Sequence, residues 1–188
     1  NQSTAASMTD IQASVDALVA VGRADSAFKT QVQEWKNILI RGNDRALFDR
    51  YLKGFEQQEA LVQDNLKQVE PYLRVADPES TTISRLLADH ALLGSRYRAA
   101  LAGFEVGDAD AGKKVDVAVR GMDRDFSKGL GELVAALQQA EAEHVQKQML
   151  AAESAYLDAR NGILATLLAG AAIVGLLGGT LFKGFEAL

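Results

Sequence analysis

The 188-residue sequence has no cysteine, only two prolines and only two histidines, His90 and His144. Without cysteine there is no disulfide, no thiol nucleophile and no thiolate site for zinc or an iron–sulfur cluster. Two histidines far apart in sequence argue against a multi-histidine metal site, and we expect no metal and no cofactor. The scarcity of proline, with abundant Ala, Leu, Gln, Glu and Lys, favours long helices over sheet. A net charge of −5 gives no reason to expect a nucleic-acid partner.

Motifs of the common enzyme classes are also missing. The sequence contains no Gly-rich phosphate loop, no nucleophile elbow and no HExxH motif. Glu141 and His144 form a single Glu-x-x-His, whereas a di-metal site in a helical bundle needs two such pairs and two more carboxylates. We therefore predict no catalysis, and we expect both histidines to pack in layers of a bundle with one hydrogen bond each.

Charge is missing from one long stretch near the C-terminus. The 22 residues between Arg160 and Lys183, NGILATLLAGAAIVGLLGGTLF, carry no charge. A helix needs about 20 apolar residues to cross the hydrocarbon layer, so we predict a transmembrane helix over 161–182, followed by a cytoplasmic segment over 183–188. The alternative is a buried C-terminal helix of a larger soluble fold. Small residues recur at every fourth position, Ala171, Gly175 and Gly179, which is typical of closely packed membrane helices and suggests a homodimer contact.

The first 160 residues have the pattern of four helices. Apolar residues at steps of three and four predict helices over about 7–41, 45–75, 80–106 and 109–160, with Asp44 as an N-cap. Short connections favour an all-α, antiparallel up-down-up-down four-helix bundle, with the turns near residues 42 and 108 at one end. No breaker separates Ala109 from the apolar run, so the fourth helix is predicted to continue into the transmembrane helix. Pro71 is expected to kink the second helix or end it early.

Two stretches of this bundle resemble a known family. Phe28–Asp44, FKTQVQEWKNILIRGND, and Leu92–Leu130 resemble the extracytoplasmic sensor domain of bacterial methyl-accepting chemotaxis receptors. The resemblance extends over about residues 8–182. It implies a homodimer in the cytoplasmic membrane, with residues 1–160 on the periplasmic or extracellular side. No membrane helix precedes Asn1 in the sequence, so the chain is expected to begin just after one. The tail KGFEAL is too short to show the linker and signalling coiled coil of such receptors, so the type of output domain stays open.

The function that follows from this resemblance is sensing. A small molecule such as an organic or amino acid would bind the bundle, and a shift of the fourth helix would carry the signal across the membrane. Three alternatives stay open. The bundle could be the input domain of a sensor histidine kinase or a cyclase, or a membrane-tethered structural or interaction protein without a small ligand. Pore formation by the Gly-rich span is a more distant alternative.

Charged residues in the distal half of the bundle suggest where a ligand would bind. By helix rise, Lys29 and Arg120 each lie about 18 Å below a distal turn, so they could share one level. Arg120 and Arg124 are four residues apart and repel each other on a bare helix, which favours a bound anion such as a carboxylate. The candidate ligand-binding residues are Lys29, Gln33, Lys36, Arg120, Asp123 and Arg124. Alternatively, these charges are solvated and balanced by neighbouring aspartates, and Trp35 belongs to the core rather than to a binding site.

Overall fold

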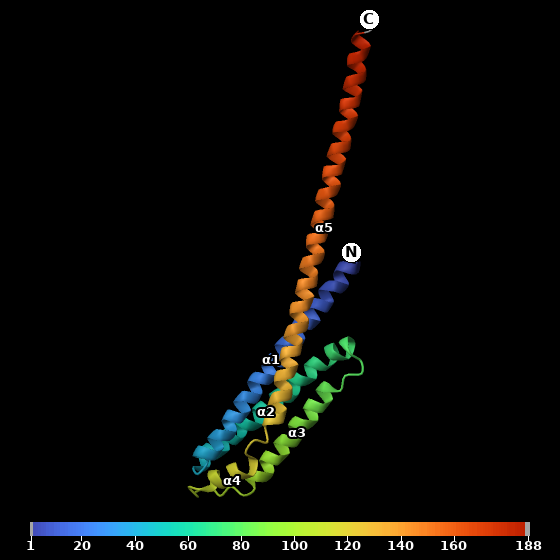
Figure 1. Cartoon of the computed structure of the whole chain (residues 1–188). Helices are drawn as coiled ribbons and strands as arrows, with labels where there is room; N and C mark the ends of the chain where they lie inside the picture. The colour runs from blue at the N-terminus through green and yellow to red at the C-terminus, as the bar shows by residue number, and fades with distance from the viewer. Residues whose placement is uncertain (1, 187–188) are drawn as a thin grey trace. The chain divides into compact units, whose positions relative to one another are not determined.

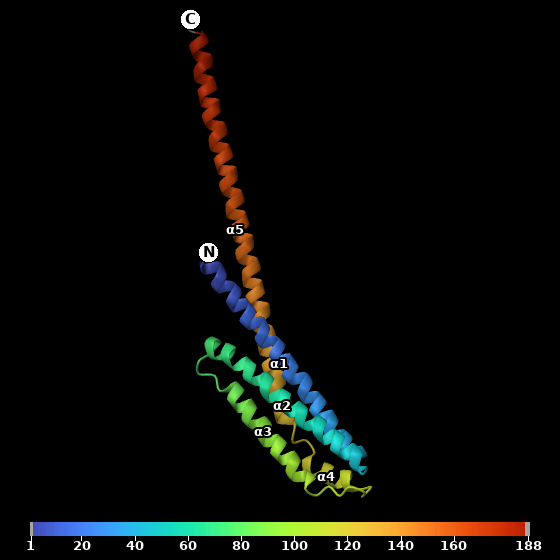
Figure 2. The same cartoon turned by 180° about the vertical axis from the view of Figure 1, so that it is seen from behind.

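The computed structural model describes the backbone of residues 2–186 and the side chains of residues 11–174. Within those residues all regular structure is helical, in the order α1 (Gln2–Arg41), α2 (Arg45–Ala76), α3 (Thr82–Leu101), α4 (Ala111–Val119) and α5 (Arg124–Glu186). The chain divides into two compact units, Asn1–Glu141 and Ala142–Leu188. The first unit contains α1 to α4 and the beginning of α5, and α1, α2 and α3 run antiparallel in it (Figures 1 and 2).

The turns at one end of the bundle meet as the antiparallel arrangement predicts. Asp44 caps α2, as predicted, because its side chain accepts a hydrogen bond of 3.0 Å from a backbone N–H in the first turn. The Gly107 N–H donates to the Asn43 carbonyl at 3.0 Å, which joins the turn before α4 to the turn before α2. The rings of Phe48 and Phe104 lie 5.1 Å apart at the same end.

The fourth position of the bundle is divided between two helices, where the sequence predicts one helix over 109–160. α4 ends before Arg120, whose ψ is 116°, and Gly121 then adopts a φ of +80°, which favours glycine. Apolar spacing does not reveal this break, because Val119, Met122 and Phe126 keep steps of three and four across it. From residue 124 onward the predicted continuity holds, since α5 is one uninterrupted helix of 63 residues.

The end of α3 also differs from the prediction. α3 ends at Leu101 rather than near residue 106, and Gly103 follows it closely. The Phe104 N–H then donates to the Leu101 carbonyl at 2.9 Å, which closes a turn instead of continuing the helix. This earlier end leaves a longer connection to α4, whose path brings the two distal turns together.

Pro71 does not end the second helix early. α2 continues through Pro71 as far as Ala76. Proline removes the helical hydrogen bond to the carbonyl four residues earlier. On either side of it, however, Val69 is fully buried and Leu73 packs against the core, so side-chain burial holds this part of α2 in place.

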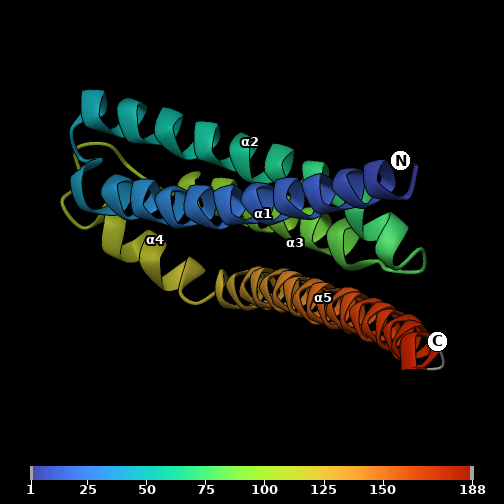
Figure 3. The same ribbon diagram turned by 90° about the horizontal axis from the view of Figure 1, so that it is seen from above.

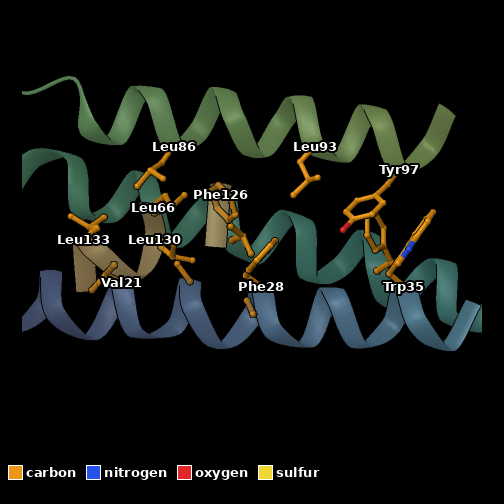
Figure 4. Close-up of a cluster of buried hydrophobic side chains, with 14 of the residues drawn as sticks. Val21, Phe28, Trp35, Leu66, Leu86, Leu93, Tyr97, Phe126, Leu130 and Leu133 are labelled. Atoms are coloured by element: carbon orange, nitrogen blue, oxygen red, sulfur yellow. The ribbon is translucent and has the colours of Figure 1, made fainter. Parts of the chain in front are cut away.

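The core of the first unit is a layer of apolar side chains from all five helices, and Figure 4 shows part of it. Trp35 is 3% exposed, and its ring lies 4.3 Å from that of Tyr97 and 5.8 Å from that of Phe55, so it belongs to this core. Seen from above, α2 lies along one side of α1 and α4 along the other (Figure 3). The beginning of α5 supplies four buried residues, Phe126, Leu130, Leu133 and Leu137.

The second unit consists of the remainder of α5. All side chains described in it, residues 142–174, are exposed, and its large apolar residues from Ile163 onward are Ile163, Leu164, Leu167, Leu168, Ile173 and Val174. Within the described residues, α5 is the one helix long and apolar enough to cross a membrane. Of the predicted helix-packing residues, Ala171 is exposed, whereas Gly175 and Gly179 lie outside the residues whose side chains are described.

A pair of glycine substitutions tests the packing of α4 on α1. A Cβ added at Gly112 would lie 1.8 Å from the Leu39 carbonyl oxygen, so Gly112→Ala must push the two helices apart. A Cβ at Gly131, on an exposed face of α5, would meet nothing within 4 Å. In urea unfolding of the detergent-solubilised chain, we expect Gly112→Ala to lose about 2 kcal/mol. Gly131→Ala should gain about 0.5–1 kcal/mol. Equal stability of the two variants would contradict the close helix contact.

Candidate ligand-binding groove

A groove lies between the end of α1 and the outer face of α4. Its volume is about 580 Å³, within the ordinary range of small-molecule sites. Three cations from the two helices line it, Lys36, Lys113 and Arg120. Apolar side chains line it as well, the larger of which are Leu39, Ile40 and Val117.

The groove exists because α4 turns one face inward and the other outward. Val115 and Val119 are buried, and Gly112 brings the α4 backbone against Leu39. Residues three and four apart share a face of a helix, so Lys113, Val117 and Arg120 lie together on the outer side. This surface also carries apolar side chains, because Ile40 and Val117 are 74% and 71% exposed.

The charges of the groove leave one cation in excess. Arg120 pairs with Asp116 at 2.6 Å, and Lys113 pairs with Asp110 at 2.8 Å. Lys36 has no ion-pair partner among the residues that the structure describes. Both observed pairs lie within α4 or at its start and are exposed, so a ligand anion can exchange with their carboxylates at little cost. The groove therefore suits one negative charge attached to an apolar group.

The predicted site residues are divided between this groove and other places. Lys36 and Arg120 both line the groove. Lys29 does not line it, since its side chain is 73% exposed and pairs with Asp25 at 2.6 Å. Gln33 is exposed one turn before Lys36 and does not line the groove.

The last two predicted residues lie in and after the turn that separates α4 from α5. Asp123 acts electrostatically on Tyr97, whose pKa is raised by burial and, to a lesser extent, by this carboxylate. The Arg124 side chain lies next to Gly121, within about 3.3 Å of the position that a Cβ there would take. An unbroken helix over 109–160, which the sequence predicts, would place both residues on the same helix as Arg120, and the break at Gly121 separates them from it.

Most residues that line the groove do not belong to the predicted set, among them Ile40, Lys113 and Val117. The signal that could have found them is an exposed apolar side chain beside a cation. Lys36 and Ile40 are four residues apart on α1, and Lys113 and Val117 have the same spacing on α4. Apolar periodicity alone treats such residues as incidental, because it identifies the buried face of each helix.

The two histidines have different environments. His90 is fully buried and bonds to two glutamines, and burial, with a smaller effect of Arg98, lowers its pKa to about 4. His144 does not lie in a packing layer, since it is exposed and bonds to Gln148 at 2.9 Å. Glu141, which the sequence paired with it, instead accepts a hydrogen bond from the Ser14 hydroxyl of α1.

A curated bacterial protein has a sequence similar to this chain. The chain is 37% identical over 133 residues to the methyl-accepting chemotaxis protein CtpH of Pseudomonas aeruginosa. The match covers 69% of this chain and 22% of CtpH, so the chain spans about a fifth of the length of that relative. No family model matches the chain, and no solved structure matches it significantly. The chain is thus a distant and partial homologue of a chemotaxis receptor, in agreement with the resemblance noted in its sequence.

The burial of His90 predicts a loss of stability in acid. Its pKa falls from 6.5 in the unfolded chain to about 4 in the folded one, so between these values the unfolded chain binds a proton that the folded chain excludes. The unfolding free energy should therefore decrease from pH 7 to pH 4 by roughly 3 kcal/mol through this group. Urea titrations across this interval measure the effect. His90→Gln should flatten the dependence and His144→Gln should preserve it, whereas an unchanged slope in His90→Gln would show that other groups cause it.

Proposed function

We propose that the chain is the extracytoplasmic sensor domain and membrane helix of a bacterial chemoreceptor. The observation that carries this proposal is α5, which supplies Phe126 to Leu137 to the bundle core and continues without interruption into an exposed apolar segment. A helix that is apolar on all sides suits lipid and is poorly suited to water. The similarity to a chemotaxis receptor supports the same assignment. On this proposal the bundle faces the outside of the cytoplasmic membrane.

The ligand that fits the groove is a small carboxylate with an apolar body, such as an organic or amino acid. Arg120 can hold a carboxylate through two parallel hydrogen bonds, with Lys36 as a second cation. Ile40 and Val117 would cover the apolar part and would lose their own exposure to water. The groove is open rather than enclosed by the core, so binding is expected without unfolding of any helix.

The position of Arg120 offers a route for the signal. It is the last residue before the turn at Gly121 that joins α4 to α5. A ligand that draws Arg120 away from Asp116 would reorient this turn and bias the position of α5. Helix shifts of about 1–2 Å suffice in known switches of this kind. A homodimer, with Ala171, Gly175 and Gly179 at the membrane contact, belongs to the same proposal.

The same bundle would serve a sensor histidine kinase or a cyclase equally well as an input domain. Similarity to a chemotaxis receptor favours the chemoreceptor. The tethered bundle without a ligand is the competing class, and it predicts that the paired charges of α4 are only solvated surface.

Thermal unfolding of the full chain in lipid nanodiscs tests the sensor against the tether. A panel of organic acids, amino acids and aromatic acids is added one compound at a time. A ligand present at 100 times its dissociation constant should add about 2.7 kcal/mol to the stability of the folded state. Lys36→Ala and Arg120→Ala should abolish that stabilisation. Lys29→Ala is the matched control, because Lys29 is an exposed cation of α1 that does not line the groove.

The outcomes separate the parts of the proposal. Stabilisation that is lost in the two groove variants and kept in Lys29→Ala supports both the sensor and its site. Stabilisation that survives in all three variants leaves a sensor but contradicts the groove. Absence of stabilisation by every compound in a folded chain contradicts direct sensing of a small acid.

A further inference from the structure

His90 lies at a point where four helices of the bundle meet. Its Nε2 is 2.8 Å from Oε1 of Gln31 on α1, and its Nδ1 is 2.9 Å from Nε2 of Gln63 on α2. Its ring is 4.8 Å from that of Phe126, at the beginning of α5, and 6.0 Å from that of Phe28 on α1. Phe28 and Phe126 also contact each other edge to face at 4.7 Å. The histidine of α3 therefore links α1, α2 and α5.

The hydrogen bonds that connect Gln63, His90 and Gln31 have defined directions, and the contact of Gln63 with the Leu87 carbonyl sets them. Nε2 of Gln63 lies 3.1 Å from the Leu87 carbonyl oxygen, which can only accept, so the amide must present its N–H₂ there. The same N–H₂ group then donates to Nδ1 of His90, which requires the neutral ring with its proton on Nε2. That proton is donated to Oε1 of Gln31. Turning the Gln63 amide over would place two oxygens against each other.

The side-chain amide of Gln31, at the other end of these hydrogen bonds, keeps a donor that is unpaired within the described residues. Gln31 is fully buried, and its Nε2 has no hydrogen-bond partner among the residues that the structure describes. An unpaired buried donor lowers the stability of the fold, because its N–H has lost its hydrogen bonds to water and gained none in return. The hydrogen bonds from Gln63 to Gln31 thus run in one direction and end at an unpaired donor of Gln31.

A proton on Nδ1 is incompatible with this arrangement. It would place the N–H of His90 against the N–H₂ of Gln63, and Leu87 prevents the amide from turning over. It would also create a charge inside the core, near the like charge of Arg98. Arg98, on α3, is held by Glu59 of α2 at 2.6 Å. The other groups packed on the ring do not titrate: Phe28 and Gln31 of α1, Gln63 of α2 and Phe126 of α5.

We propose that the Gln63–His90–Gln31 chain is an acid-sensitive latch, which holds the first turn of α5 in the bundle and releases it when His90 gains a proton. The latch rests on the proposed function only in that α5 is taken to carry the output. In an opened bundle, His90 would regain its ordinary affinity for protons. From values of 6.5 open and about 4 closed, the ratio of open to closed molecules should rise about 30-fold between pH 8 and pH 5.

Spin-label distances in the full chain test this latch, and the absence of native cysteine makes the labels specific. Arg85→Cys on α3 and Lys128→Cys on α5 are both exposed and flank the packing of Leu86 against Gly129. In nanodiscs without any ligand, this pair should gain a longer distance as the pH falls from 8 to 5. A reference pair at Lys29 and Lys53, on α1 and α2, should keep its distance.

Two background variants identify the responsible group. The longer distance should persist in His144→Gln and disappear in His90→Gln. A change of equal size in His90→Gln would overturn the latch, and so would the absence of any change between pH 8 and pH 5 in the otherwise unaltered chain.

If His90→Gln fails to fold, ¹⁵N NMR spectra of the histidine rings in the unaltered chain test the latch instead. The latch requires the Nε2–H tautomer of His90 at pH 8. An Nδ1–H tautomer of His90 at pH 8, or titration of His90 at its ordinary value of 6.5, would overturn it. Because no ligand is present, failure of the latch and failure of the sensor proposal are separate results.

Discussion

The attachment of α5 to the bundle depends on Phe126. This residue follows the turn that divides α4 from α5, and its ring is 3% exposed between Phe28 of α1 and His90 of α3. Aromatic side chains bury large areas and hold specific mutual geometries, so this contact fixes both the position and the rotation of α5 at its beginning. Leu130, Leu133 and Leu137 continue the same face along the core.

The two helices α4 and α5, which together take the place of the fourth helix of the bundle, differ in length and in what they contact. α4 is short, lies against α1 through Gly112, and displays cations and exposed apolar side chains. α5 is long, begins in the core and contains the apolar segment. The turn at Gly121 separates the two helices, although α4 also contributes Val115 and Val119 to the core. A change in the groove can therefore reach the core through these side chains as well as through the turn that leads to Phe126.

Much of the fold could be predicted from periodicity and caps. The all-α class, the antiparallel order, the cap at Asp44 and the core position of Trp35 follow from residue spacing and from the chemistry of helix ends. The break at Arg120 and Gly121 could not be predicted, because the apolar steps continue across it. The sequence has 16 glycines, and nothing in it indicates which of them adopts a positive φ. Because this break was not predicted, the candidate site residues lie in more than one place. Lys36 and Arg120 line one groove, whereas Asp123 and Arg124 belong to the turn and the start of α5.

On the proposed function, α5 joins a water-exposed bundle to a membrane span. Lys128 and Leu168 are both exposed in the structure, so without a membrane cysteines at these positions should react equally with a maleimide that cannot cross lipid. In intact vesicles bearing the bundle outside, we expect Lys128→Cys to react at once and Leu168→Cys to react only after detergent is added. Equal reaction of both cysteines in intact vesicles would contradict the claim.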